Sequence, residues 1–444
     1  MAAVYTILFI LTLGSLVFWI IISSIKYKSL LNPILLYSIV WLIPMGLSMT
    51  GLFDLFVPQV FTVLLILVNV YCFNISCFLI KNNRKGVKRN KTDLFADDYL
   101  SGKKKYIALV MANILCILWL VPFIQKMLPF IVSGNWVIAR SFYLLASTNH
   151  TVYTVIDSLF LQWIITPLFY ATALIAAYFV AKQRPNYFLL VLSIFDLSAV
   201  VLATAGRNAI LKYILFFVFA YLFINENKSS LWRKIKDSSP LIKLIMISGV
   251  LALSYITLQR RLSDNTTVLE NIYVYFVGPI AYFNNILENT SNYGLFSDYL
   301  FGRATFGFIT TPLEIISSRL FNVDYNGVDN IITSYVSQYV NVTPNIKGNA
   351  FSTSLYPFMM DFGWLGVVIG PAIFGQIVGR IFRRSQEVTN VNQVFWKCLM
   401  VFFGFIIFFS EWEYELIFPY TAFVMLYLYI FFYKKRIKIG NLKL

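Results

Sequence analysis

The sequence predicts an all-α polytopic integral membrane protein, and three observations carry this prediction. Of the 444 residues, 59% are hydrophobic and only 13% are charged, whereas soluble domains carry about 25% charged residues. Apolar runs of about 20 residues, long enough to cross a bilayer as helices, recur along the chain. These runs are continuous rather than alternating, which disfavours a transmembrane β-barrel.

We expect about eleven transmembrane helices. The first lacks a basic leading region and a small-residue cleavage motif, so we interpret it as a retained helix and not as a signal peptide. The predicted spans are 3–24, 32–51, 59–80, 106–125, 158–181, 186–203, 208–224, 241–258, 357–379, 394–410 and 417–433.

The basic residues predict the orientation of these helices. Lysines and arginines concentrate in every second loop, above all in 81–105, and in the tail after residue 433. Loops rich in Lys and Arg face the cytoplasm, which places the N-terminus outside and the C-terminus inside. The same distribution accounts for the net charge of +16 without a nucleic-acid partner.

Two membrane bundles and one large loop make up the predicted domain organisation. Residues 1–258 form a bundle of about eight spans, which includes the basic cytoplasmic loop 81–105, and residues 357–444 form a bundle of about three. The segment 259–356 between them is an outer loop, and loops of such length are usually functional.

The large outer loop should be partly helical. Residues 272–287 are rich in Tyr, Phe, Val and Ile, and we expect a break at Gly278-Pro279. Residues 306–320 form a second apolar stretch of the same kind. Such stretches either lie on the membrane or re-enter it.

The cysteines and acidic residues argue against a metal site. All four cysteines fall in apolar runs and none has the spacing of zinc ligands, which also argues against a disulfide framework. They are Cys72, Cys77, Cys116 and Cys398. Because no acidic cluster resembles a cage for a divalent cation, we expect neither a metal nor a cofactor.

Arginines gather on the predicted outer face, where the orientation rule gives no reason for them. Arg207 lies in a very short loop between two apolar runs and is the first candidate. The others are Arg140, Arg260, Arg261 and Arg303. The planar guanidinium matches phosphate oxygens, so we expect a diphosphate site at the outer interface. The alternatives are contact with lipid phosphates or pairing with Asp264, Glu270 or Asp298.

Several carboxylates are candidates for acid–base work. Asp361, near the outer edge of a span, either activates a sugar hydroxyl or holds a polar network at the helix entrance, and Glu288 is a further candidate base. Asp196 lies within a span, where we expect either an ion pair with Lys212 or a proton relay or substrate contact.

The last outer loop alternates acidic and aromatic residues. Glu411, Glu413 and Glu415 form either a solvated acidic loop with an aromatic belt, or one of them faces an outer cavity. Asn349 and Tyr356 are expected to contact substrate. Tyr335, Tyr339 and Trp364 either stack on sugars or pack inside the protein.

Two motifs resemble a known family. Gly206-Arg207 opens a span in the middle of the chain. The large outer loop ends in Gly-Asn-Ala-Phe-Ser-Thr at 348–353, eight residues before Asp-Phe-Gly-Trp-Leu-Gly at 361–366. Together with the many spans, these motifs resemble the bacterial oligosaccharide repeat-unit polymerases that make O-antigen and capsular polysaccharide.

The resemblance implies a glycosyltransferase C-type fold in the bacterial cytoplasmic membrane. It implies an undecaprenyl-diphosphate-linked glycan as donor, transferred en bloc to a lipid-linked acceptor, with membrane lipid and a chain-length regulator protein as partners. We expect Arg207, Asp361 and Glu288 to be catalytic, without a metal. Substrate binding is assigned to Arg140, Arg260, Arg261, Arg303, Asn349 and Tyr356.

The mechanism and the class of protein each leave alternatives. Related ligases use a histidine of the large outer loop, whereas the only histidine here is His150, outside 259–356. This favours a mechanism that uses a carboxylate or arginines alone. The alternatives to a polymerase are a ligase of the same chemistry and a flippase for the lipid-linked glycan. Transporters usually show internal repeats, and none is evident in this sequence.

Overall fold

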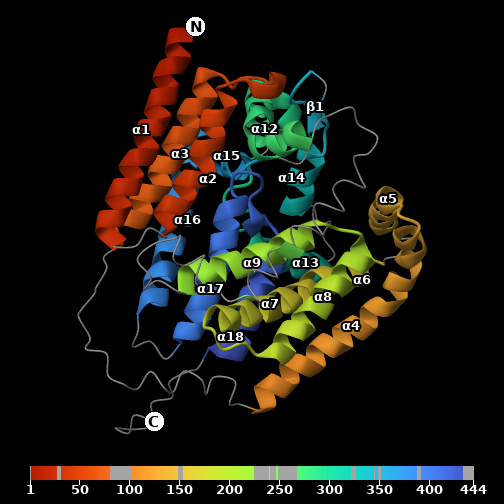
Figure 1. Ribbon diagram of the computed structural model, residues 1–444. Coiled ribbons are helices and arrows are strands. Elements are labelled where there is room, and N and C mark those ends of the chain that lie inside the picture. The colour runs from red at the N-terminus through yellow and green to blue at the C-terminus, as the bar shows by residue number, and fades with distance from the viewer. Residues whose placement is uncertain are drawn as a thin grey trace. The chain divides into compact units, whose positions relative to one another are not determined.

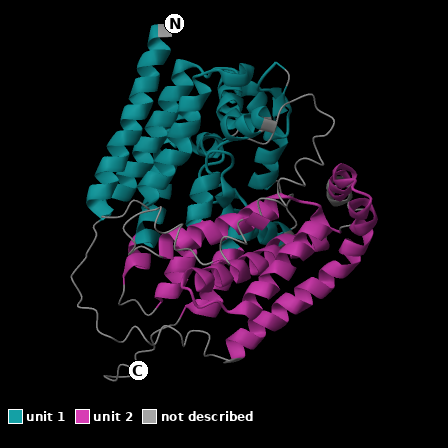
Figure 2. Cartoon of the chain, in the orientation of Figure 1, with its two compact units in different colours: residues 1–81, 264–382, 403–422 teal, residues 82–263, 383–402, 423–444 magenta. Residues whose placement is uncertain are grey.

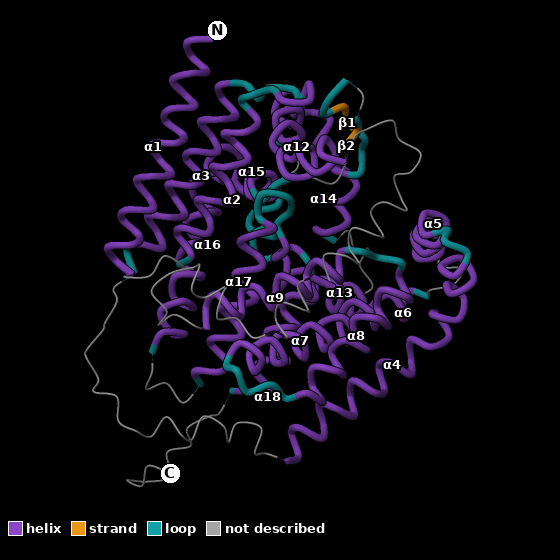
Figure 3. The backbone as a smooth tube through the Cα atoms, in the orientation of Figure 1, coloured by secondary structure: helices purple, strands orange, loops and turns teal. Residues whose placement is uncertain are grey.

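The structure is a computed structural model, and it is helical almost throughout the part of the chain that it describes (Figure 1). The described residues are 2–27, 32–80, 103–148, 154–224, 240, 247–248, 268–297, 299–321, 327–344, 346–348, 352–387 and 392–433. A short antiparallel pair of strands, β1 (Val340–Asn341) and β2 (Lys347–Gly348), interrupts the helices (Figure 3).

The described residues form a series of α-helices. In chain order they are α1 (Ala2–Tyr27), α2 (Pro33–Ser48), α3 (Val60–Phe78), α4 (Lys103–Val132), α5 (Trp136–Thr148), α6 (Val155–Phe160), α7 (Thr166–Ala181), α8 (Tyr187–Thr204), α9 (Asn208–Ile224), α12 (Val268–Glu288), α13 (Gly307–Phe321), α14 (Val328–Val336), α15 (Leu355–Phe362), α16 (Gly366–Gln386), α17 (Gln393–Phe409) and α18 (Pro419–Phe432). Single turns of other helix types are η1 (Leu52–Asp54), η3 (Leu161–Ile165), η4 (Thr290–Tyr293), η5 (Gly363–Leu365) and η6 (Glu415–Ile417).

Within the described residues, six helical segments are long and apolar enough to cross a membrane. They are Ala3–Tyr27, Val60–Phe78, Lys104–Val132, Ile156–Ala181, Tyr187–Thr204 and Leu355–Gln386, and α2, α9, α17 and α18 are shorter apolar helices. Each predicted span within the described residues coincides with one of these segments, which marks an all-α membrane protein. The predicted span 241–258 lies almost entirely outside the described residues.

Short polar residues set where several of these helices begin. The Asn32 side chain accepts a hydrogen bond from the Leu35 N–H, and Pro33 occupies the first position of α2. Asn186 caps α8 in the same way through the Leu189 N–H. A capping side chain satisfies one of the N–H groups that a helix start leaves without a partner. Proline is tolerated there because its missing N–H would have no partner in the helix.

The break predicted at Gly278-Pro279 is wrong. Helix α12 runs without interruption through Pro279. A proline inside a helix costs roughly 3 kcal/mol, but α12 buries Ile280, Tyr282 and Phe283 completely. Each buried side chain of this size contributes about 1.5–3 kcal/mol, so packing outweighs the hydrogen bond that Pro279 cannot donate.

The chain forms two compact units (Figure 2). Unit 1 comprises 1–81, 264–382 and 403–422, and unit 2 comprises 82–263, 383–402 and 423–444. These units cut across the predicted boundaries after residues 258 and 356. In unit 1, α12 of the outer segment belongs with the first helices because its Asn284 Oδ1 accepts hydrogen bonds from Gln59 N–H (2.8 Å) and the Thr62 hydroxyl (2.6 Å).

Two glycines four residues apart let α16 approach α3 inside unit 1. A Cβ atom on Gly375 would lie 2.4 Å from the Phe73 carbonyl oxygen, and one on Gly379 would lie 3.1 Å from Cys77 Sγ. Without a strong hydrophobic force in lipid, such close backbone contact is a main source of helix association.

We therefore expect Gly375→Val to separate α16 from α3. Overpacking of this kind destabilises by about 1–3 kcal/mol, seen as a lower thermal midpoint of the purified protein in detergent. Gly14→Val is the matched control, because a Cβ on Gly14 meets no atom within 4 Å. Equal midpoints for the two variants would contradict this account of the contact.

Candidate functional site

The turn between α8 and α9 in unit 2 carries the first candidate, Arg207. Ala205 ends α8 in the left-handed conformation, with φ 48°. The Gly206 N–H donates to the Thr204 hydroxyl at 3.2 Å, and this hydroxyl donates to the Val200 carbonyl at 2.8 Å. The Arg207 carbonyl accepts from Leu211 N–H, which makes Arg207 the residue that opens α9. Arg207 is half-buried.

A second predicted arginine reaches the same turn. Arg140, on α5, donates from Nη1 to the Thr204 carbonyl at 3.0 Å and lies over the Tyr143 ring at 5.0 Å. Its Nη1 is 3.6 Å from where a Cβ of Gly206 would stand. Burial lowers the pKa of the Arg140 guanidinium, and Tyr143 partly opposes this shift. The structure therefore brings Arg140 against the dipeptide Gly206-Arg207.

Packing between α4, α5 and the turn fixes this arrangement. Met127, Ala139 and Ala205 form one buried apolar cluster. A Cβ on Gly206 would stand only 2.9 Å from the Thr204 hydroxyl, so a larger residue there would displace the Thr204 side chain. Two arginines beside a helix N-terminus can bind an anion, because guanidinium groups and the first N–H groups of a helix all donate to phosphate oxygens.

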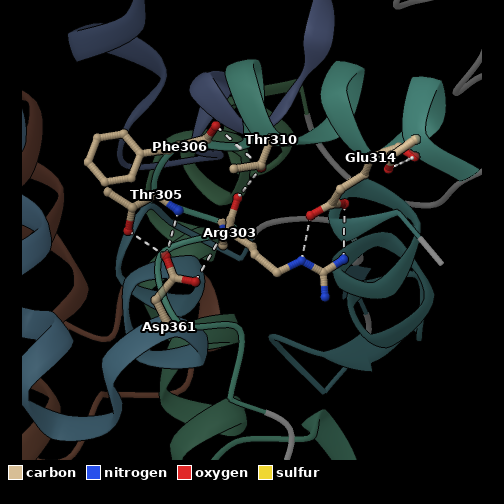
Figure 4. A network of polar contacts seen from close by, with 8 residues as sticks. Arg303, Thr305, Phe306, Thr310, Glu314 and Asp361 are labelled. Atoms are coloured by element: carbon tan, nitrogen blue, oxygen red, sulfur yellow. Dashed lines mark hydrogen bonds and ion pairs between the residues drawn. The ribbon is translucent and has the colours of Figure 1, made fainter. Parts of the chain in front are cut away.

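In unit 1, the carboxylate of Asp361 holds a turn and is buried. Its Oδ1 accepts from Ala304 N–H at 3.0 Å, and its Oδ2 accepts from the N–H and the hydroxyl of Thr305 at 2.6 and 2.5 Å (Figure 4). The Thr305 carbonyl in turn accepts from the Tyr414 hydroxyl at 3.1 Å. The sequence suggested that Asp361 either activates a sugar hydroxyl or holds a polar network at the helix entrance. The contacts in the structure are those of a polar network.

The same turn presents Arg303. Its side chain extends away from Asp361 and forms a two-pronged ion pair with Glu314, with Nε–Oε1 at 2.6 Å and Nη2–Oε2 at 3.0 Å (Figure 4). This partner is not one of the three carboxylates that the sequence suggested. The Arg303 side chain is 39% exposed, so this ion pair lies at the surface of the protein.

Two further predicted residues have structural contacts in unit 1. Glu288 Oε1 accepts from Gln59 Nε2 and from Asn284 Nδ2, both at 2.8 Å. Tyr356 is completely buried and donates to the Tyr293 carbonyl at 2.6 Å. In this conformation its ring is closed off from substrate.

The remaining candidates are either exposed on the protein surface or lie outside the residues that the structure describes. Tyr339 is exposed, and Trp364 is exposed while its ring contacts Phe296 with centroids 4.7 Å apart. The predicted positions outside the described residues are Arg260, Arg261, Asn349 and His150.

The ion pair expected between Asp196 and Lys212 is wrong. Asp196, on α8, is completely buried, and neither carboxylate oxygen has a hydrogen-bond partner among the described residues. The Lys212 ammonium lies 5.9 Å from the centroid of the Tyr170 ring. The aromatic ring offers the cation a favourable face. The carboxylate oxygens of Asp196 have no hydrogen-bond partner among the described residues.

The prediction that the last outer loop exposes its glutamates to solvent is also wrong for two of the three. Glu411 and Glu415 are buried, and Glu411 Oε1 has no hydrogen-bond partner among the described residues. Two backbone hydrogen bonds attach their loop to residues 353–354. Thr353 N–H donates to the Trp412 carbonyl (3.1 Å), and Ser354 N–H donates to the Ser410 carbonyl (2.8 Å). The alternation with aromatic residues was the available signal for burial, because such residues seek packing.

Burial raises the pKa of the Glu411 carboxyl well above its ordinary value. The unfolded chain therefore releases this proton at a lower pH than the folded protein. The contribution of Glu411 to the free energy of unfolding is largest below the ordinary pKa of a glutamate. It decreases as pH rises toward the pKa in the folded protein, by at most about 1.4 kcal/mol per pH unit.

We expect Glu411→Gln and the native protein to have the same thermal midpoint near pH 4.5. As pH rises toward 8, the midpoint of Glu411→Gln should exceed the native midpoint by an increasing margin. Thermal midpoints in detergent across this range measure the effect. Glu413→Gln, at the half-exposed neighbour, should show no growing margin. A constant offset for Glu411→Gln at all pH values would overturn the expected titration.

The described residues contain no group of three or more His, Cys, Asp or Glu side chains placed to hold a metal ion. Comparison of the chain with protein-family models, with curated proteins and with solved structures finds no match.

Proposed function

We propose that the protein is a repeat-unit polymerase that joins undecaprenyl-diphosphate-linked oligosaccharides at the outer face of the bacterial cytoplasmic membrane. The observation that carries this proposal is the contact of Arg140 with Thr204 and Gly206, in the turn that leads to Arg207 at the start of α9. It supports a site for a diphosphate at the end of two membrane helices, which is where a lipid-linked substrate presents its diphosphate.

The proposed reaction breaks the bond between the anomeric carbon of the donor glycan and its diphosphate. The terminal sugar hydroxyl of the acceptor forms the new glycosidic bond, and undecaprenyl diphosphate leaves with the developing negative charge. The proton of the attacking hydroxyl passes to an oxygen of the leaving diphosphate. Guanidinium groups held in place before the reaction stabilise that charge most in the transition state. We assign this role to Arg207, with Arg140 binding the donor diphosphate.

We assign Asp361 and Glu288 to positioning. Asp361 accepts three hydrogen bonds from the turn that presents Arg303, and Glu288 accepts one from Gln59, just before α3, and one from Asn284 of α12. Both carboxylates thus hold neighbouring groups in place, and Asp361 is buried. The proposed transfer therefore depends on arginines and needs no metal.

The proposed setting follows the charge distribution and the motifs. We propose eleven spans in a glycosyltransferase C-type arrangement, with the N-terminus outside and the basic tail in the cytoplasm. A chain-length regulator protein is the proposed partner.

The test is incubation of the purified protein in vesicles with a synthetic undecaprenyl-diphosphate repeat unit, followed by sizing of the products. We expect a ladder of lengths. A single unlengthened species would overturn the polymerase. Transfer of preformed glycan only to a different acceptor would identify a ligase.

A flippase is the second candidate because of Asp196. An unpaired carboxylate buried within a membrane helix is typical of transport and proton pathways. Movement of lipid-linked glycan across the vesicle membrane without lengthening would favour the flippase, and Asp196→Asn should then abolish that movement.

A further inference from the structure

Helix α13 carries a row of exposed aliphatic side chains. Ile309, Leu313, Ile316 and Leu320 are spaced by four, three and four residues, which places them on one face of the helix. Leu313 is 60% exposed and Leu320 73%. We call these four residues the α13 stripe. Large aliphatic side chains in one row mark a face that contacts lipid or another apolar surface.

The other side of α13 is fixed at the level of two membrane helix ends. A Cβ on Gly307, the first residue of α13, would lie 2.7 Å from the Ile417 carbonyl oxygen in η6. The turn η6 stands between the end of α17 at Phe409 and the start of α18 at Pro419. Because both are apolar helices, the start of α13 lies where the membrane interface should be.

The apolar surface before α13 continues from a membrane span. The Leu300 N–H donates to the Met360 carbonyl of α15 at 2.9 Å, so this turn is attached to the start of the span Leu355–Gln386. Leu365 and Val368 of that span are exposed, and so is Phe301, at 81%, in the turn. The exposed surface therefore passes from the span to the turn that leads into α13.

Charged groups flank the stripe rather than interrupt it. Arg303 lies in the turn before α13, and its partner Glu314 lies on the helix beside the stripe. An arginine at this depth can reach lipid phosphates while the aliphatic side chains enter the lipid. This combination fits a phosphate-bearing lipid surface better than an apolar protein partner.

We propose that α13 lies in the membrane interface, with the α13 stripe inserted among lipid chains and Arg303 held at the depth of lipid phosphates. The occupant of the stripe is the bilayer itself. This inference does not rest on the proposed function, because any lipid bilayer supplies the chains and phosphates. In this proposal Asp361 positions α13 and Arg303, because both extend from the turn that Asp361 holds.

Nitroxide accessibility in the full chain tests the proposal. Leu313→Cys and Ser334→Cys are each made in a Cys72→Ser background, labelled, and reconstituted in phospholipid vesicles. The remaining native cysteines are buried. Ser334 is exposed on α14, where the exposed residues Asn330 and Thr333 are also polar, which makes it the control. Oxygen gathers in lipid and a nickel chelate stays in water, so their collision rates report the surroundings of each label.

We expect the ratio of oxygen to nickel accessibility to be several-fold higher at Leu313→Cys than at Ser334→Cys. Equal ratios would overturn the proposal, because the stripe would then face water. Low accessibility to both reagents at Leu313→Cys would also overturn it, because a protein partner or second copy would cover the stripe. Should Leu313→Cys fail to fold, Ile309→Cys and Leu320→Cys probe the same stripe. No substrate enters the measurement, so its failure is separable from failure of the polymerase.

Discussion

Arg207→Ala should lower polymerisation by about 10²–10³-fold, the loss typical of removing one group that stabilises developing negative charge. The expected cause is loss of a guanidinium at the start of α9, where Arg140 contacts the same turn. The measurement is the rate of product lengthening in vesicles that contain equal amounts of folded protein. The protein should remain in the membrane, because Arg207 is half-buried at a helix end and not in the core.

Two substitutions make this result specific. Arg207→Lys keeps the charge but loses the planar fork, so it should restore only part of the activity. Arg184→Ala removes an exposed arginine after α7, on the predicted cytoplasmic side, and should leave the rate unchanged. Unchanged chain length with Arg207→Ala would remove Arg207 from the mechanism. A loss as large with Arg184→Ala would point to a general effect of charge.

The membrane helices could be predicted from the sequence because the signal for a span is local. Length and composition of a single run decide whether it can cross a bilayer, and each predicted span in the described residues coincides with an apolar helix. The continuity of α12 through Pro279 could not be predicted in this way, because the packing that compensates for Pro279 comes from residues far along the chain.

The candidate site shows the same division between local and distant information. Arg140 and Arg207 were both candidates from their positions, but the contact of Arg140 with Thr204 joins residues 64 positions apart. Asp361 and Thr305 are 56 positions apart. Residue types are enough to name candidates, whereas the partners of these candidates depend on tertiary packing. The alternation with aromatic residues indicates burial around Glu411, but the backbone pairing with 353–354 joins residues far apart in the chain.

Asp361→Asn is expected to destabilise unit 1 by about 2–4 kcal/mol. The carboxylate accepts from three donors on Ala304 and Thr305. An asparagine keeps one oxygen but points an N–H₂ group at a donor, and each buried donor left without an acceptor costs about 1–3 kcal/mol. The thermal midpoint in detergent should fall. The turn that positions Arg303 should also become less ordered.

A second variant separates this positioning role from catalysis by Asp361. Thr310→Val removes a single hydrogen bond to the same turn, from the Thr310 hydroxyl to the Arg303 carbonyl at 2.9 Å, and should cost only about 1 kcal/mol. If Asp361 positions the turn, activity should decline in step with stability across the two variants. If Asp361→Asn instead abolishes polymerisation while its melting midpoint matches the native protein, Asp361 acts as the base on the acceptor hydroxyl. The positioning role would then be wrong.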